Sequence, residues 1–359
     1  RRLPHARVVA IESDRQFGLS VLHRVDEELR RRGELFRAHG VQDVAGYRKA
    51  TGEKLPRTLL LIDEFQEFFT EDDGIGQEAS LLLDRIVRQG RAFGIHAILG
   101  SQTLGGAYTL ARATLGQMVI RIALQCNEAD AYLIMDDDNP APRLLTRPGE
   151  GIYNDNAGAL AANSPFQTVW LSEEERNTRL DEVAALARER GIKMPAPVVF
   201  EGNAPADLKE NDRLAAVLAD PPAEKPNAGR IWLGAPNSIK GPTEAVLRRQ
   251  SGSNLLVVGQ GEDRMKALMS AALVSLSAQY PADAARFVVL DPEGDGGDLA
   301  AMLKTLPQPC EVHQPGDLAG VMESLASRLE AGGEDEVFVF IRDLQRFKAL
   351  REEEDFGFS

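Results

Sequence analysis

The fold is decided by the stretch Leu59-Leu60-Leu61-Ile62-Asp63-Glu64. Four apolar residues in a row are typical of a strand that is buried on both faces of a parallel sheet. Two carboxylates follow at its carboxyl end, where open α/β sheets place their ligands. The pattern predicts that Asp63 holds Mg²⁺ or its waters and that Glu64 polarises an attacking water, as hydrolysis of a nucleoside triphosphate requires. A strand ending in a solvated acidic turn is the alternative.

A second strand-like run, Ala97-Ile98-Leu99-Gly100-Ser101-Gln102, ends in an amide side chain instead of a carboxylate. Beside the acidic strand, Gln102 can sense a γ-phosphate or orient the lytic water. Arg88 and Arg91 lie just before this run, where a planar guanidinium could reach a phosphate held by a neighbouring subunit. These residues together predict a nucleotide site between subunits.

The segment from Gly90 to Gln102 resembles the one by which FtsK/SpoIIIE-type motor ATPases are identified. Other segments of residues 1–170 occur in the order that this family leads us to expect. They are Leu3-Pro4-His5, Glu27-Glu28-Leu29-Arg30-Arg31-Arg32, Gly40-Val41, Gly46-Tyr47, Val119-Ile120-Arg121-Ile122-Ala123 and Arg147-Pro148-Gly149-Glu150-Gly151.

The resemblance implies a RecA-like α/β module that uses ATP and Mg²⁺. Such modules assemble as a homo-oligomeric ring, usually a hexamer, and pull a polymer through its centre. By the same resemblance, Asp63 would serve the metal, Glu64 the water, and Gln102 would be the sensor. Arg91 would be the arginine finger that acts on the neighbouring subunit.

The phosphate loop of such a module is missing from this sequence. A stretch of the form G-x-x-x-x-G-K-[ST] should precede the acidic strand, and residues 1–62 contain none. We therefore expect the chain to be a piece of a longer polypeptide. A naturally inactive module is the alternative.

Composition agrees with two domains in a reducing compartment. The chain has 359 residues, of which 43% are apolar and 27% charged, enough for two cores of ordinary size. Cys126 and Cys310 have no paired spacing, which indicates a reducing cytosol. The sequence has no apolar run long enough to span a membrane, so we expect a cytoplasmic protein, with attachment at the membrane face left to parts outside this chain. The net charge of −14 argues against a generally basic nucleic-acid surface.

Proline-rich stretches indicate where the organisation changes. They are Pro195-Ala196-Pro197 and Pro221–Asn227. A helix over 172–190 begins at Ser172, an N-cap residue with Glu175 three positions later, and closes the first module. We predict an ATPase module over 1–191, a linker over 192–229 and a second module over 230–359.

The second module repeats the logic of the first in altered form. Ser253–Gly259 predicts a short buried strand that ends in Gly259, followed by a tight turn with Gly261 and a helix over 266–280. Strand, turn and helix N-terminus are the architecture of a phosphate site. The residues at the positions of the second glycine, the lysine and the Ser/Thr of a phosphate loop are Arg264, Met265 and Lys266.

The acidic strand of the first module also has an altered counterpart, Glu336–Asp343. Arg342 stands where the first carboxylate should be, and only Asp343 remains. The fold prediction is therefore α/β, with two RecA-like P-loop NTPase modules of mainly parallel sheets, the second degenerate. That module would be structural or regulatory. It could still hold a nucleotide weakly through Gly259, Gly261 and Asp343, or bind a peptide or partner in the vacated pocket.

Three further features have competing interpretations. Arg121, on a predicted strand over 119–124, could contact a phosphate or form an ion pair at a strand edge. The run Arg30-Arg31-Arg32 follows two glutamates on a predicted helix, so a solvated, salt-bridged face is favoured over nucleic-acid contact. The loop Thr103–Tyr108 could face a ring pore, but it lacks basic residues.

The sequence leaves the cargo open. The prediction is an ATP-driven FtsK/SpoIIIE-type translocase acting on double-stranded DNA. The tandem layout also resembles the ATPases of type VII secretion, which move protein cargo together with other components of a multi-protein system. A third hypothesis is a scaffold that nucleotides lock together without movement.

Overall fold

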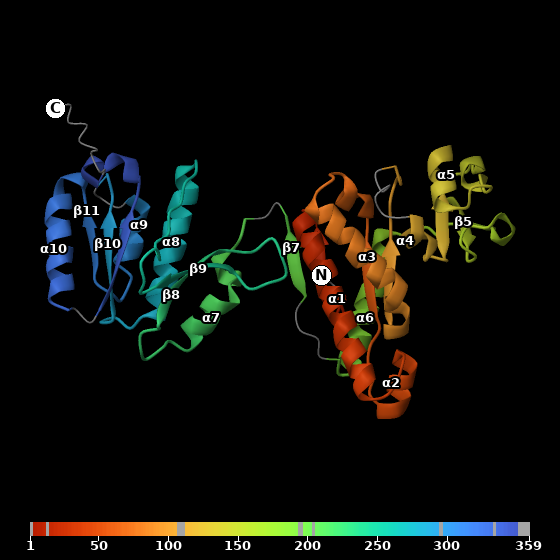
Figure 1. Ribbon diagram of the computed structural model, residues 1–359, viewed down its shortest axis with the longest axis horizontal. Coiled ribbons are helices and arrows are strands. Elements are labelled where there is room, and N and C mark those ends of the chain that lie inside the picture. Colours follow the sequence, from red (N-terminus) through yellow and green to blue (C-terminus); the bar gives the residue numbers. More distant parts are fainter. Residues whose placement is uncertain are drawn as a thin grey trace, which may run out of the picture. The chain divides into compact units, whose positions relative to one another are not determined.

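The computed structural model describes residues 3–11, 14–105, 112–192, 197–202, 205–293, 297–332 and 335–350, without the side chains of 112, 113, 297 and 298. It contains two compact units (Figure 1). The first comprises Arg1–Ala204 with Asn237–Ile239, and the second Pro205–Pro236 with Lys240–Ser359. Each unit contains a parallel sheet with helices, so the predicted α/β fold is confirmed.

The first unit is built on two parallel strands. β2 (Thr58–Ile62) and β3 (Ile95–Leu99) pair in register from Thr58 with Ile95 to Ile62 with Leu99. α1 (Arg15–Ala38) and α3 (Gly74–Phe93) lie against one another and share a core with this sheet (Figure 1). Alternate residues of each strand enter that core, as a single covered face requires.

Local signals explain where these two helices start and stop. Asp14 caps α1 by accepting a hydrogen bond from the Phe17 amide at 2.7 Å. Asp73 caps α3 in the same way through the Gly76 amide at 2.9 Å. α3 ends at Gly94, whose φ of 70° lies in the left-handed region that favours glycine.

The prediction that β2 is buried on both faces is wrong. Leu60 is 6% exposed, but Leu61 is 66% exposed and Leu59 is also open. Within the described residues, α1 and α3 cover the face that carries Leu60, and no helix covers the other face. An uninterrupted apolar run indicates a two-sided strand, but it cannot say whether the second layer is present.

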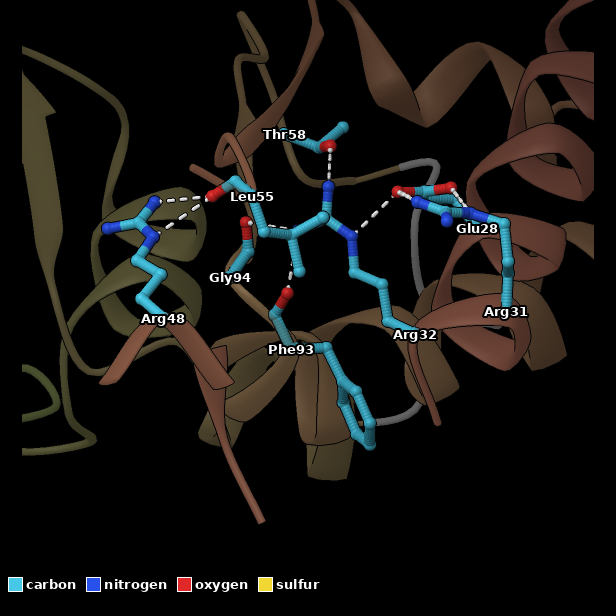
Figure 2. Close-up of polar contacts among 8 residues, drawn as sticks. All are labelled: Glu28, Arg31, Arg32, Arg48, Leu55, Thr58, Phe93 and Gly94. Atoms are coloured by element: carbon cyan, nitrogen blue, oxygen red, sulfur yellow. Dashed lines mark hydrogen bonds and ion pairs between the residues drawn. The ribbon is translucent and has the colours of Figure 1, made fainter. Parts of the chain in front are cut away.

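Arg32 corrects a second prediction, because it is not part of a solvated helix face. It is 2% exposed, whereas Arg30 and Arg31 are open and pair with acids of their own helix. Figure 2 shows its guanidinium between three elements. It donates to Glu28 at 2.7 Å, to Thr58 Oγ1 at 3.0 Å and to the Phe93 carbonyl at 2.7 Å.

These contacts place a cation at the carboxyl end of α3, where the helix dipole favours it. They fasten α1 to the end of α3 and to the start of β2 (Figure 2). Burial opposes the ionisation of Glu28, but hydrogen bonds from Arg31 and Arg32 outweigh it and lower the pKa of that carboxyl. Arg32 is therefore a structural residue that fixes the position of β2 relative to α1 and α3.

The rest of the first unit forms a smaller, antiparallel layer. Strand β5 pairs on one side with β4 and on the other with β6. α6 begins after Ser172, which accepts from the Glu175 amide at 3.1 Å, so the predicted helix is confirmed. It does not close the first unit, because β7 (Val198–Glu201) follows it there. The bounds are α2 Val44–Thr51, α4 Arg112–Gly116, β4 Arg121–Leu124, α5 Glu128–Ile134, β5 Glu150–Asn154, β6 Ser164–Gln167 and α6 Glu173–Glu189, with 3-10 helices η1 Phe65–Phe69, η2 Ala141–Leu144 and η3 Leu160–Ala162.

The stretch 192–229, predicted as a linker, contains regular structure. β7 (Val198–Glu201) pairs in parallel with β1 (Val8–Ile11). Phe200 stacks on Phe17, with ring centroids 4.2 Å apart. α7 (Asp212–Ala219) follows in the second unit. A four-residue strand among prolines and charges carries too little periodicity to be recognised in the sequence.

The second unit has a sheet covered on both faces. Its parallel strands lie in the order β11 (Cys310–His313), β10 (Ala285–Leu290), β12 (Glu336–Ile341). Figure 1 shows this sheet between α10 (Leu318–Glu330) on one side and α8 (Glu262–Gln279) with α9 (Gly297–Leu303) on the other. Alternate residues of β10 therefore enter two separate cores, which explains why the strand is buried along its length.

The remaining elements complete this unit. An antiparallel hairpin of β8 (Ala228–Gly234) and β9 (Thr243–Arg248) packs on α8, where the Trp232 amide donates to Ser275 Oγ at 3.2 Å. The short 3-10 helices are η4 Leu208–Glu210, η5 Pro315–Asp317, η6 Leu344–Arg346 and η7 Lys348–Leu350. In the described ranges of both units, no helix combines the length and apolarity that a membrane crossing needs.

The predicted buried strand at Ser253–Gly259 is wrong. These residues form no regular structure, and Val258 is 86% exposed. A strand needs a partner for its backbone groups, and no strand in the described part of the chain pairs with this segment. α8 also begins earlier than predicted, at Glu262 instead of residue 266.

Candidate active site at the ends of β2 and β3

β2 ends in a sharp change of direction. Asp63 follows the strand, and Glu64 then adopts a left-handed conformation with φ 52° and ψ 47°. Non-glycine residues are uncommon in this region. The 3-10 helix η1 follows directly, and its phenylalanines are buried in the core. The turn lifts both carboxylates off the sheet at its carboxyl edge.

β3 approaches Asp63 more closely than a side chain would allow. The Gly100 amide donates to the Ile62 carbonyl at 2.8 Å, and the Phe65 amide donates to the Gly100 carbonyl at 3.1 Å. A Cβ atom on Gly100 would stand 3.0 Å from Asp63 Oδ1. Glycine at this position therefore allows β3 to pass directly beside the Asp63 carboxylate.

Glu64 and Gln102 are brought together as the sequence suggested. Gln102 Nε2 donates to Glu64 Oε1 at 2.5 Å. The Gln102 side chain is exposed, and that of Glu64 is half-buried. A carboxylate that can accept a proton and an amide that can orient a small polar molecule thus share one edge of the sheet, beside Asp63.

Asp130 supports this edge and was missed by the sequence analysis. It is 5% exposed, and its Oδ1 accepts hydrogen bonds from Thr103 Oγ1 at 3.1 Å and from the Leu104 amide at 2.7 Å. Ser101 Oγ contacts Gln66 Oε1 at 2.6 Å on the other side. The residues that flank Gln102 are therefore held from both α5 and η1. The only sequence signal for Asp130 is its place three residues after the helix cap Asn127.

The two candidate arginines of α3 differ in their surroundings. Arg88 Nε donates to both oxygens of Asp84, at 2.7 and 2.8 Å. This hydrogen bond, followed by one from Thr114, lowers the pKa of the Asp84 carboxyl. Arg91 is exposed on the last turn of α3, and no described residue accepts a hydrogen bond from its side chain.

Arg91, on the last turn of α3, lies away from the acidic edge within one chain. α3 ends where β3 begins, whereas Asp63 and Gln102 lie past the carboxyl ends of the strands. The five residues of β3 place these two edges roughly 13 Å apart. Arg91 could reach such an edge only in another subunit.

Arg121 has a structural environment. Its guanidinium donates to the carbonyls of Met118 at 3.1 Å, Ile134 at 3.1 Å and Met135 at 2.9 Å. Burial lowers the pKa of this arginine, and the charge of Asp136 opposes that shift. The structure brings Arg121 neither to the acidic edge nor into the ion pair that was the alternative interpretation.

The donor set at the edge suits a hard cation. Asp63 offers carboxylate oxygens, which Mg²⁺ prefers, and Mg²⁺ commonly uses one or two carboxylates together with substrate phosphates. Among the described residues, no group of three or more His, Cys, Asp or Glu side chains could hold a metal by itself. Asp63 therefore fits a metal that a bound phosphate would share.

No protein-family model matches the chain. Several curated proteins match part of it. The chain is 27% identical over 221 residues to the ESX secretion system protein YukB of Bacillus subtilis, covering 58% of this chain and 14% of the relative. It is 27% identical over 226 residues to the DNA translocase SftA of Bacillus subtilis, covering 59% and 22%. It is 30% identical over 161 residues to the ESX-4 secretion system protein EccC4 of Mycobacterium tuberculosis, covering 43% and 12%.

The chain is thus similar both to secretion system proteins and to a DNA translocase, in keeping with the resemblance to FtsK/SpoIIIE-type ATPases seen in its sequence. It spans less than a quarter of the length of these curated relatives. Solved structures share its fold over both units. The cytoplasmic domain of the Thermomonospora curvata type VII secretion ATPase EccC has a TM-score of 0.58 at 18% identity, covering 96% of this chain and 47% of that one. ATPases 2 and 3 of EssC from Geobacillus thermodenitrificans give 0.53 at 16%, covering 92% and 59%.

The second unit repeats the strand-end geometry of the first. Asp343 follows β12 with φ 51° and ψ 56°, nearly the values of Glu64, and a 3-10 helix, η6, begins immediately. Arg342 therefore takes the place of Asp63, as the sequence alignment of the two strands predicted.

We call the strand end at Asp63 and Glu64 the first corner and the one at Arg342 and Asp343 the second corner. The second corner contains the positive charge of Arg342. It is 5% exposed, and its Nε donates to Asp291 Oδ1 at 3.1 Å. Nη2 lies 2.8 Å from Asp291 and 2.7 Å from Glu293, and Nη1 lies 3.7 Å from Glu262. Burial would lower the pKa of the guanidinium, but these carboxylates outweigh it and raise it.

The glycines predicted to hold a phosphate do not form a cradle. Gly259 is exposed, and a Cβ atom there would meet nothing within 4 Å. Gly261 precedes α8 with φ 105°, in a backbone conformation that favours glycine. The first turn of α8 carries Glu262 and Asp263, which place negative charge where a phosphate would bind.

Proposed function

We propose that the first unit provides the hydrolytic side of an ATPase site in a translocation motor. The observation that carries this proposal is the hydrogen bond between Gln102 and Glu64, beside Asp63, at the ends of two neighbouring parallel strands. The site also needs a phosphate loop, which this sequence does not contain. The proposal therefore concerns the residues that act on the γ-phosphate and on water.

Each side chain has a role that follows from its place. Asp63 would hold Mg²⁺, and the metal would neutralise charge on the triphosphate when bound. Glu64 draws a proton from the attacking water, because its carboxylate stands free of any cation among the described residues. Gln102 orients that water through its amide. Its hydrogen bond to Glu64 would break or form again as the phosphate leaves.

Arg91 is the proposed finger in trans. Arg88 is committed to Asp84, whereas Arg91 is exposed at the opposite edge of the sheet from the acidic corner. A ring of identical subunits, in which one edge of each subunit faces the next, would bring Arg91 to a neighbour's phosphate. There its guanidinium would neutralise charge in the transition state.

Two cargoes are candidates. Double-stranded DNA is the superfamily expectation, and SftA is named a DNA translocase. Protein cargo is favoured by the similarity to YukB and EccC4, both named as ESX secretion system proteins, and by the net charge of −14. In either case we propose a cytoplasmic ATPase that works with other components, at the membrane face if the system secretes.

The test is Glu64→Gln in the complete motor. ATP turnover should fall by about 100-fold or more, while ATP binding is retained, because the amide cannot accept the proton. Glu67→Gln is the matched control, since Glu67 is an exposed carboxylate three residues away on η1. Unchanged turnover in Glu64→Gln would remove this residue from the mechanism and favour a nucleotide-locked scaffold.

The cargo is tested in the same preparation. Stimulation of turnover by double-stranded DNA, lost steeply as salt is raised, would support the DNA motor. Stimulation by a C-terminal peptide of a helical secreted protein would support the secretion motor and contradict the DNA one.

A further inference from the structure

The second unit contains a buried arginine that the proposed function does not use. Arg342 stands where the first unit has Asp63, and its guanidinium contacts three acids from two separate segments. Asp291 follows β10, Glu293 lies in the turn after it, and Glu262 opens α8. One cation thus joins two strand ends to the start of a helix.

We propose that Arg342 is a built-in cation that takes the place of the metal and nucleotide in the second unit, so that this unit keeps its corner closed without either ligand. In a phosphate site, a metal and phosphates link the acidic strand to the helix N-terminus. Here the guanidinium makes that link from β12 to α8 by itself.

Because Arg342 and Asp291 are buried, the ion pair between them is costlier to break than an ion pair on the surface. The side chains of Arg342 and Asp291 are 5% and 2% exposed. A charge pair withdrawn from water is costly to break on one side only, because the remaining charge is left uncompensated. The carboxylates around Arg342 would therefore repel one another, and the corner would open, if the guanidinium were removed.

The same charges exclude an anionic ligand. Glu262 and Asp263 occupy the first turn of α8, and Lys266, which lies one turn further, is paired with Glu262 at 2.9 Å. A triphosphate arriving here would meet carboxylates on the helix end that should attract it. Mg²⁺ would meet a guanidinium already bound to Asp291. The second unit is thus insensitive to nucleotide whatever cargo the first unit moves, and this inference stands apart from the proposed function.

The chain offers a reporter for each unit, because it has two tryptophans. Trp232 lies in the second unit and is 3% exposed, and Trp170 lies in the first and is 88% exposed. Trp170→Phe in the full chain leaves Trp232 as the only tryptophan. Its fluorescence then follows urea unfolding of the second unit alone.

The experiment compares Arg342→Ala with Arg346→Ala in this background. Arg346 is exposed on η6, and no described residue pairs with its side chain. We expect Arg342→Ala to lower the urea midpoint by about 1 M, and Arg346→Ala to leave it in place. Magnesium chloride should restore at least half of the loss in Arg342→Ala, because the vacated carboxylates can then bind the ion. It should not shift the parent.

Three results would contradict the proposal. A higher midpoint of the parent in the presence of Mg²⁺ and ATPγS would overturn the proposal, since the corner would then accept a nucleotide. An Arg342→Ala midpoint like that of Arg346→Ala would also overturn it. A loss that Mg²⁺ does not restore would reduce Arg342 to an ordinary structural ion pair. If Arg342→Ala fails to fold, Arg342→Lys replaces it as the test, because lysine keeps the positive charge. The second unit of Arg342→Lys should fold, with a urea midpoint below that of the parent and of Arg346→Ala.

Discussion

The two strand ends of this chain have the same backbone and opposite charge. Glu64 and Asp343 adopt the same left-handed turn, each followed by a 3-10 helix. The residue before the turn is Asp63 in the first unit and Arg342 in the second. In the first, an acid faces a glycine and is open to a ligand; in the second, an arginine is enclosed by acids. The turn geometry is thus independent of the chemistry that it presents.

The sheets that carry these corners differ in a related way. β10, the central strand of the second sheet, is covered on both faces, and Arg342, which follows the neighbouring strand β12, is 5% exposed. β2 is covered on one face only among the described residues, and Leu61 on the other face is 66% exposed. The unit with the proposed catalytic edge is therefore the one whose sheet is covered on a single face by the described residues. The second unit is thus stabilised by its own side chains, whereas the first leaves an apolar sheet face and the Asp63 carboxylate exposed.

The largest predicted effect comes from making the first corner resemble the second. Asp63→Arg should reduce ATP turnover of the complete motor by about 100-fold or more, because a guanidinium would replace the carboxylate that we assign to the metal. The fold should survive, since Asp63 is exposed. Turnover and circular dichroism measure the two effects. Asp72→Arg, an exposed change in the turn before α3, is the control. Turnover within a few-fold of the parent would show that the two corners differ for another reason.

A smaller effect, on stability, tests how the sheet beneath the first corner is held. Arg32→Met keeps the volume of the side chain but removes the cation that joins Glu28, Thr58 and Phe93. The free energy of unfolding should fall by about 3 kcal/mol, because Glu28 loses its buried partner. Hydrogen exchange of peptides from α1 and α3 would show the loss. Arg31→Ala, at an exposed position of the same helix, should change it by less than about 0.5 kcal/mol.

These two predictions also show where sequence reasoning succeeds and fails. The placement of Asp63, Glu64 and Gln102 at one edge of the sheet could be predicted because apolar runs locate strands, and parallel strands end at one edge. The equivalence of Arg342 with Asp63 followed from the same pattern. Arg32 could not be separated from Arg30 and Arg31, since nothing in a run of arginines says which one faces inward.

Other failures arose where structure depends on distant partners. Ser253–Gly259 has the composition of a strand but no neighbour to pair with among the described residues. β7 has a neighbour, β1, that lies almost the whole first unit away in sequence. Asp130 supports the residues around Gln102 from another helix, which no local motif reveals. Pairing and support of this kind are properties of the folded chain.

A third prediction concerns the close approach that keeps Asp63 beside β3. Gly100→Ala places a methyl group about 3.0 Å from Asp63 Oδ1, so the carboxylate must move by a few tenths of an ångström. Turnover of the complete motor should fall by about 10-fold, because small misplacement of a reacting group is costly. Gly116→Ala is the control, since a Cβ atom there meets nothing within 4 Å. Equal turnover in both variants would mean that Asp63 tolerates displacement and would weaken its assignment to the metal.

The smallest predicted effect is a pH dependence of the segment that follows the first corner. Arg15 donates to both oxygens of Asp73, at 2.9 and 2.7 Å, and to the Phe68 carbonyl at 2.8 Å, which fastens η1 to α1. The hydrogen bond from Arg15, then that from the Gly76 amide, lowers the pKa of the Asp73 carboxyl. A depressed pKa contributes stability that is fully present above the unfolded value, about 3.9, and is lost as the pH falls through the folded value.

Urea unfolding of the first unit between pH 6 and pH 2.5, followed by hydrogen exchange of α3 peptides, measures this loss. Asp73→Asn should be less stable than the parent at pH 6 and should lose less as the pH falls, so the two curves converge in acid. Asp72→Asn should run parallel to the parent, because no described residue pairs with Asp72. Parallel curves for Asp73→Asn and the parent would mean that the Arg15 contact carries no net charge dependence. The anchoring of η1 would then rest on its buried phenylalanines.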